Sequence, residues 1–421
     1  MNFNRKTPRI FYGWWLVIGC FFIWLLQGGF ILLGFTAFFD PIAEEFGWSY
    51  TQVSLAASLR GIETSLLAPV LGVMVDRFGP RRLMFGGMII ICLGFLMLGL
   101  MHSLAVYYFA FALIAIGLSG SSPTVAITAI ANWFHRRVSL ATGIIGAGFA
   151  LGGLVVPMVV LLIDKFGWRD AVFILLVVTL VVNVPLSLLF RHKPEQYGYL
   201  PDGELRSTTL AAPAVSVPTV KLDMGVRQAM RSRAFWQISI ALVLLQLTVN
   251  AVIVHVMPFL GTVGIMRSVA SLVAMGVSLS SGLGRLGAGM LGDRLNKKHV
   301  TTASLVCSTL GLLAFHYVTP GAPWLLWTFM FLFGLGWGGI FTMRAGLIAE
   351  YFGRANFGTV LGIMLGMSSV GSFLGPVLAG WAFDAWGSYG YFWLELAGLA
   401  FLGVIIMVTT PPPGDRTVKL M

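Results

Sequence analysis

The chain has 421 residues, of which 57% are hydrophobic and only 10% are charged, and its formal net charge is +11. A soluble domain carries about a quarter charged residues, so this composition excludes a globule that covers itself with polar groups in water. In a soluble protein the positive charge would indicate a nucleic-acid partner. We expect no nucleic-acid partner here, because the basic residues are distributed unevenly between the two sides of a predicted membrane protein.

Apolar runs recur along the chain, each about 20 residues or longer and able to cross a hydrocarbon core of about 30 Å as a helix. They do not alternate polar and apolar residues, as barrel strands would. Charged or turn-rich breaks divide the chain into twelve predicted spans, at residues 11–39, 51–75, 83–101, 104–133, 139–162, 168–190, 234–263, 268–292, 299–318, 324–352, 357–382 and 389–408. We therefore expect an all-α protein in a lipid bilayer.

The longest break is polar and rich in proline, and it separates six spans from six. It predicts an N-terminal six-helix bundle over residues 1–190, a linker over 191–233 and a C-terminal six-helix bundle over 234–421. On the side opposite the linker and both termini, the basic residues are only Lys165, Arg169 and Arg267. The positive-inside rule then predicts a multi-pass protein of the cytoplasmic membrane, inner or plasma, with both termini cytoplasmic.

The two halves repeat each other at an offset of roughly 217–220 residues, which is the sequence signature of an internal structural repeat. Gln27 matches Gln246. The longer matches are Gly72-x-x-x-Asp76-Arg77-x-Gly79-x-Arg81-Arg82 with Gly289-x-x-x-Asp293-Arg294, and Asp164-Lys165-Phe166-Gly167 with Asp384-Ala385-Trp386-Gly387. Two parallel six-helix repeats with a site between them are typical of transporters that work by alternating access.

The stretch from Gly72 to Arg82 resembles the loop motif of the major facilitator superfamily. That resemblance implies the major facilitator fold, two pseudo-symmetric six-helix bundles, and a charge-assisted cytoplasmic gate. Asp76 at a helix end can meet basic groups and a neighbouring helix N-terminus. The alternative is that these charges only enforce topology.

Two further stretches narrow the resemblance. Trp133-Phe134-x-Arg136-Arg137-x-x-Leu140-Ala141-x-Gly143 is similar to the loop and fifth helix of the monocarboxylate porters. Arg285-x-x-x-Gly289-x-x-x-Asp293 resembles span 8 of those porters and of the oxalate/formate antiporters, which implies that Arg285 pairs with a substrate carboxylate. The usual proton-coupling residues are missing, because Leu33 and Ser281 stand at their positions. Span 11 also lacks the lysine of the oxalate antiporters.

Two arginines fall near the middle of predicted spans, where an ionisable residue costs at least about 2.5–3.5 kcal/mol and usually faces a cavity or a partner. Arg285 lies eight residues before Asp293, and Arg344 lies eight residues before Phe352, so their depths are similar. A guanidinium can hold a carboxylate through two hydrogen bonds, so the two predict an anion clamp. The alternative is a structural pair with Glu350 or a backbone carbonyl.

Three amides accompany these arginines: Gln246 and Asn250 one turn apart, and Gln27 in the first repeat. They are candidates to line the same cavity, or they bridge helices. Glu63 and Arg60 lie three residues apart on the second span. Glu63 could carry a proton, but the sequence favours a fixed ion pair with Arg60.

Together these features predict a secondary active transporter of small organic anions, monocarboxylates of the lactate or pyruvate type, working by a rocker-switch cycle. A proton or a counter-anion would complete the cycle. A dicarboxylate or oxalate-type antiporter is the alternative, and a drug efflux permease of the same fold is the weaker one. We find no catalytic constellation, metal cluster or nucleotide loop, so we expect no enzyme activity and no cofactor, and a monomer as the functional unit.

Overall fold

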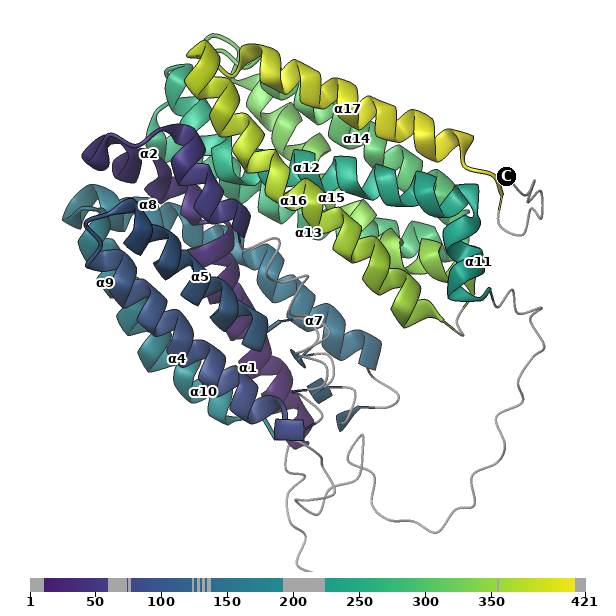
Figure 1. The fold of residues 1–421 in the computed structure, drawn as a ribbon, viewed down its shortest axis with the longest axis horizontal. Helices are drawn as coiled ribbons and strands as arrows, with labels where there is room; N and C mark the ends of the chain where they lie inside the picture. Colours follow the sequence, from purple (N-terminus) through teal and green to yellow (C-terminus); the bar gives the residue numbers. More distant parts are fainter. Residues whose placement is uncertain are drawn as a thin grey trace, which may run out of the picture. The chain divides into compact units, whose positions relative to one another are not determined.

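The structure is a computed structural model, which describes residues 11–59, 74, 77–122, 125–126, 129–130, 133–134, 138–191, 224–353 and 356–412. Within these ranges the regular elements are all helical (Figure 1). They are α1 Tyr12–Gln27, η1 Gly28–Leu32, α2 Phe35–Phe46, α4 Pro80–Gly99, α5 Leu104–Gly120, α7 Val138–Leu151, η2 Gly152–Val155, α8 Val156–Phe166, α9 Trp168–Val178, η3 Thr179–Asn183, α10 Val184–Leu188, α11 Val226–Arg231, α12 Arg233–Thr262, α13 Arg267–Arg294, α14 Lys297–His316, α15 Trp324–Phe352, α16 Phe357–Trp386 and α17 Gly390–Thr409.

The predicted spans of the second half are confirmed, since α12 to α17 occupy them in order. The largest difference is at the end of α16, which runs to Trp386 rather than to residue 382. Among the described residues, 10 helices are long and apolar enough to cross a membrane. The shorter α5 matches the start of the predicted fourth span, and most of the predicted second span lies outside the described residues.

The first span is longer than predicted, because α1, η1 and α2 form one apolar stretch over Tyr12–Phe46. Its irregular turn η1 meets the irregular turn η2: a Cβ added to Gly29 would lie 2.5 Å from Val155 Cβ and 2.7 Å from the Gly152 carbonyl oxygen. Non-helical backbone at membrane depth is tolerated where protein covers it. The sequence pattern alone did not reveal this contact.

Contacts divide the chain into two compact units. Unit 1 comprises residues 1–27, 67–149 and 172–214, and unit 2 comprises 28–66, 150–171 and 215–421. In unit 1, α4 packs along α5. In unit 2, α13 packs against α15, α14 against α15 and α17, and α12 against α16 (Figure 1). The predicted division into bundles at residues 190 and 234 stays a prediction.

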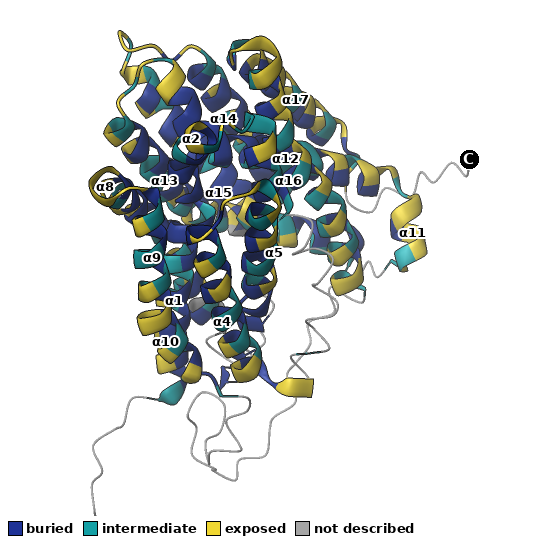
Figure 2. Cartoon of the chain, turned by 60° about the vertical axis from the view of Figure 1, so that its left-hand side comes forward, coloured by how far each residue is buried: buried dark blue, intermediate teal, exposed yellow. Residues whose placement is uncertain are grey.

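Several helices have exposed outward faces (Figure 2), and many of the exposed residues are large and apolar. On α17, Leu394, Phe401, Ile405 and Val408 recur on one side, and each is 43–55% exposed. A stripe of this kind would be unfavourable in water, whereas hydrocarbon solvates it without cost. The burial pattern therefore agrees with a multi-pass membrane protein.

Candidate functional site

Two arginines from neighbouring helices approach one aromatic ring in unit 2. The Arg285 Cζ atom of α13 lies 4.3 Å from the centroid of Phe341 on α15, and the Arg344 Cζ atom lies 4.8 Å from the same centroid. A ring face attracts a guanidinium, and this attraction strengthens when the pair is desolvated. The ring carries no net charge, so this contact brings two positive charges close together.

Glycines bring these two helices into backbone contact. A Cβ added to Gly338 of α15 would overlap the Ser281 carbonyl oxygen of α13 and lie 2.9 Å from the Arg285 backbone nitrogen. Thr342 Oγ1 also donates a hydrogen bond to the Arg285 carbonyl oxygen at 3.3 Å. Small residues at a membrane helix interface allow this approach, and here they hold the arginine backbone close to α15.

A small hollow, with room for about one water molecule, opens beside Arg344. Its walls come from α12, α15 and α16. They consist of Leu242, Leu245, Gln246, Trp337, Ile340, Phe341, Arg344 and Ser368. Five of these side chains are apolar, and one of the polar ones is a cation, which is the usual composition of a site for a small ligand with one anionic group.

The predicted amides of α12 lie close to this hollow. Gln246, which lines it, donates from Nε2 to Ser372 Oγ of α16 at 3.1 Å. Asn250 Nδ2 donates to the same hydroxyl at 3.2 Å and to the Gln246 carbonyl oxygen at 2.9 Å. Both amides therefore bridge α12 to α16, and only Gln246 also reaches the hollow.

Gln27 lies in unit 1 and is 6% exposed. Its Nε2 donates to Ser121 Oγ at 2.7 Å and contacts Met88 Sδ at 3.6 Å. This amide bridges α1 to α4 and to the end of α5, in the way that buried polar groups in membrane helices usually find partners.

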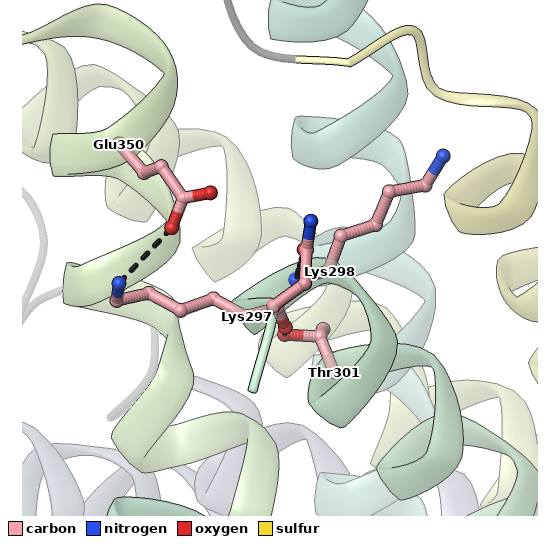
Figure 3. Close-up of polar contacts among 5 residues, drawn as sticks. Lys297, Lys298, Thr301 and Glu350 are labelled. Atoms are coloured by element: carbon pink, nitrogen blue, oxygen red, sulfur yellow. Dashed lines mark hydrogen bonds and ion pairs between the residues drawn. The ribbon is translucent and has the colours of Figure 1, made fainter. Parts of the chain in front are cut away.

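Glu350, the alternative partner considered for Arg344, is engaged elsewhere. Its Oε2 atom accepts from Lys297 Nζ of α14 at 3.0 Å (Figure 3). Over the part of the chain that the structure describes, the ion pairs are Arg169–Glu45, Arg267–Asp164 and Lys297–Glu350, and Arg344 belongs to none of them. The structure therefore offers no acid to neutralise Arg344 within that part.

The loop motif is described only in part. Gly72, Asp76, Arg60 and Glu63, as well as the side chain of Asp293, lie outside the described residues. Gly79 has a φ of 79° and precedes the proline that begins α4, so its place in the motif follows from a backbone conformation that favours glycine. The other described residues of the predicted cytoplasmic gate are exposed or partly exposed: Arg77, Arg81, Arg82, Gly289 and Arg294.

Phe341, Trp337, Ser368 and Ser372 were not predicted as site residues. A signal was present for the two aromatic residues, since Trp337, Phe341 and Arg344 recur at helical spacing and share one face of α15. No comparable signal marked the serines, because their role depends on how α16 packs against α12.

A family model described as the Major Facilitator Superfamily matches residues 16–265 and 245–420. The chain belongs to this superfamily. Relatives across the superfamily include Monocarboxylate transporter 13 of Bos taurus, 25% identical over 98% of this chain and 92% of that protein. The uncharacterized MFS-type transporter YcxA of Bacillus subtilis (strain 168) is 24% identical over 98% of this chain and 97% of that protein.

Solved structures of transporters share the superfamily fold. A bacterial homolog of the human lysosomal transporter Spinster, in an inward-facing and occupied conformation, matches with a TM-score of 0.71 at 16% identity, covering 96% of each chain. The nucleoside transporter NupG matches with a TM-score of 0.74 at 15% identity, covering 95% of this chain and 99% of that chain. At these identities the likeness shows the fold alone.

Proposed function

We propose that this protein is a secondary active transporter of small monocarboxylates, and that Arg285 and Arg344 bind the carboxylate. The observation that carries the proposal is the approach of both guanidinium groups to the Phe341 ring beside the hollow. Two like charges held close together in the interior of a membrane protein repel each other, and an anion bound beside them would relieve that repulsion. Several relatives are named monocarboxylate transporters, which supports this substrate class.

Gln246 and Ser368 supply polar groups at the hollow, while its apolar side chains suit a short hydrocarbon tail. Asn250 positions Gln246 through their shared partner, Ser372. We place both termini and the 191–233 linker in the cytoplasm, with a six-helix bundle on each side of the linker. The described members of the Gly72–Arg82 and Gly289–Arg294 stretches then lie at the cytoplasmic gate.

We propose exchange as the mode of transport. In the empty carrier the two arginines stay charged. The change of conformation without substrate would then be unfavourable, because the closed site would contain neither the substrate anion nor water to solvate the two charges. A second anion loaded on the opposite side removes that barrier. In a proton-coupled cycle an acid would have to neutralise the site instead, and Glu63 is the candidate from the sequence.

Uptake of labelled lactate or pyruvate into proteoliposomes tests the proposal. We expect uptake that requires an internal anion, is lost in Arg285→Ala, and persists in Arg231→Ala, which removes an exposed arginine of α11. Uptake driven by an inward proton gradient without internal anion would replace exchange by proton coupling. If neither anion is carried and Arg285→Ala changes nothing, the substrate class is wrong.

A dicarboxylate exchanger is the second candidate, and the same two arginines favour it. Guanidinium groups at 4.3 Å and 4.8 Å from one ring centroid could each hold one carboxylate of a single short molecule. Competition decides between the two. Under the monocarboxylate proposal, unlabelled oxalate or succinate competes more weakly than unlabelled pyruvate.

A further inference from the structure

The repeated motif that ends with Gly167 and Gly387 has a role that substrate binding does not explain. Gly167 follows the end of α8 with a φ of 82°, and Gly387 follows the end of α16 with a φ of 64°. Each glycine terminates its helix three residues after an acid, Asp164 or Asp384. An acid in the last turn meets the negative end of its own helix dipole, so each carboxylate needs a positive partner on another helix.

Asp384 finds its partner at the N-terminus of the helical segment 50–59. The backbone N–H of Tyr50 donates to Asp384 Oδ1 at 2.9 Å, and that of Thr51 donates to Oδ2 at 2.8 Å. The Thr51 hydroxyl donates to the same carboxylate. The carboxylate therefore lies where the positive end of this helix dipole and its free N–H groups coincide.

The segment's own capping residues leave those two N–H groups for Asp384. Ser49 Oγ accepts from the backbone N–H of Gln52 at 3.2 Å, and Gln52 Oε1 accepts from that of Ser49 at 3.0 Å. This reciprocal pair is a capping box. Nothing in the box reaches Tyr50 or Thr51, so an acid from the other half of the sequence completes the cap.

Asp164 finds the corresponding partner in Arg267, the first residue of α13. Arg267 Nη1 donates to Asp164 Oδ1 at 3.0 Å, and Nη2 donates to the Ala37 carbonyl oxygen of α2. The repeat offset relates Asp164 to Asp384 and Arg267 to Tyr50. In both copies an acid at the end of one helix binds the beginning of another, across the two halves of the sequence.

Beside each acid the helices meet through a glycine. A Cβ added to Gly380 would lie 2.7 Å from the Tyr50 carbonyl oxygen and 2.8 Å from Ser54 Oγ. At the other contact, a Cβ on Gly153 would lie 2.5 Å from Ser278 Cβ, and Ser278 Oγ donates to the Ala150 carbonyl oxygen at 2.8 Å. The glycines let the helix backbones approach closely. Beside Gly380 the Tyr50 ring also packs on Phe383, with centroids 4.2 Å apart, so opening of this contact must separate that aromatic pair as well.

We propose that Asp384 and Asp164 are repeat-related latches: their bonds hold closed the end of the transporter at which both acids lie. Both sets of bonds break when that end opens during the transport cycle. The ion pair of Asp164 with Arg267 is exposed by 43% and 35%, so water can replace it when it breaks. The bonds to Asp384 are likewise exposed. The latches do not depend on which solute is carried, and only their location on the outer face rests on the proposed orientation.

Cysteine accessibility tests the latches without any substrate. Ser54 lies at the Asp384 contact and Ser278 at the Asp164 contact, and both are fully buried. Each is replaced by cysteine, as Ser54→Cys or Ser278→Cys, to report exposure of its contact. The background is a variant in which the three native cysteines are replaced by alanine. Each latch is broken while the reporter at the other contact is read: Asp384→Asn with Ser278→Cys, and Asp164→Asn with Ser54→Cys. Labelling by a membrane-impermeant maleimide, added outside right-side-out vesicles, then reports opening of the whole end.

We expect labelling about tenfold faster in each latch variant, which corresponds to the loss of one hydrogen bond to a charged group. Asp170→Asn is the matched control, because it removes an exposed acid from the same end of the molecule, and its labelling rate should not change. Unchanged rates in the latch variants, or equal acceleration in the control, would overturn the proposal. Asp384→Asn is also combined with Ser54→Cys, and Asp164→Asn with Ser278→Cys. Acceleration confined to these neighbouring reporters would overturn the proposal, because that result means local loosening.

A charge swap covers the case in which an asparagine variant fails to fold. Arg267→Asp alone should expose the Ser54→Cys reporter, and adding Asp164→Arg should restore much of its protection. No restoration would exclude the ion pair as a latch. Faster labelling only from the cytoplasmic side would support the latches and overturn the proposed orientation, whereas a wrong substrate class would leave all of these rates unaffected.

Discussion

Gln27 and Gln246 occupy matching positions in the two repeats, yet their surroundings differ. In unit 1, the buried Gln27 amide donates to Ser121 and holds helices together. In unit 2, Gln246 donates to Ser372 in a similar way but also faces a hollow that contains Arg344. The comparison shows that a repeat can keep the same polar residue for helix packing in both copies, while only one copy places a charged side chain beside it, at a candidate binding site.

The largest expected effect on transport comes from changing Arg285, in the second repeat. Arg285→Ala should lower kcat/KM for uptake roughly 100-fold, since a guanidinium makes hydrogen bonds to an anion that contribute about 1.5–3 kcal/mol each. Arg285→Lys should recover part of this, because lysine keeps the charge and loses the two-pronged geometry. Proteoliposome kinetics measure both, with Arg231→Ala as control. Equal activity of the lysine and alanine variants would contradict a role for the charge.

The second prediction concerns the helix contact that positions Arg285. Gly338→Ala should destabilise the protein by about 1–3 kcal/mol, because the added methyl group overlaps the Ser281 carbonyl oxygen. Gly287→Ala on α13 is the matched control. No atom of the described residues lies within 4 Å of its added Cβ, so we expect no loss and a small helix-propensity gain. Thermal unfolding in detergent measures both, and equal melting temperatures would show that α13 and α15 can separate freely.

The third prediction tests the two glutamines directly. Gln27→Leu should lower thermal stability by about 1–3 kcal/mol, because the buried Ser121 hydroxyl loses its donor, while KM stays unchanged. Gln246→Leu should raise KM with a smaller loss of stability, since Gln246 is only partly buried. Melting curves and uptake kinetics on the same preparations separate the two effects. The comparison fails if both variants change the same quantity.

The smallest effect belongs to the pair of Lys297 with Glu350. These side chains are 33% and 28% exposed, and pairs with such exposure contribute about 0–1 kcal/mol. Glu350→Gln should therefore shift the melting temperature slightly, and less at high salt, without a change in substrate affinity. An affinity loss as large as that of Arg344→Gln would show that Glu350 pairs with Arg344 during the cycle.

Much of the fold follows from the sequence, for one physical reason. A bilayer core accepts only segments that satisfy their own backbone, so hydropathy alone predicts the helices from α12 to α17 with boundary errors of a few residues. The positions of Arg285 and Arg344 along those helices follow as well, because helical rise converts residue number into depth. Helical spacing on α15 would also have revealed Trp337 and Phe341.

Which groups contact one another was decided by the tertiary structure. Glu350 binds Lys297 rather than Arg344, and Asp384 caps a helix that begins more than 300 residues earlier, at Tyr50. Periodicity places a side chain on a face of its helix, whereas its partner depends on which helix lies opposite that face and how closely glycines let the two approach. The sequence by itself therefore determined the helices, the repeat and the charged positions. Packing decided which charges lie together in a candidate anion site and which bind the beginning of another helix.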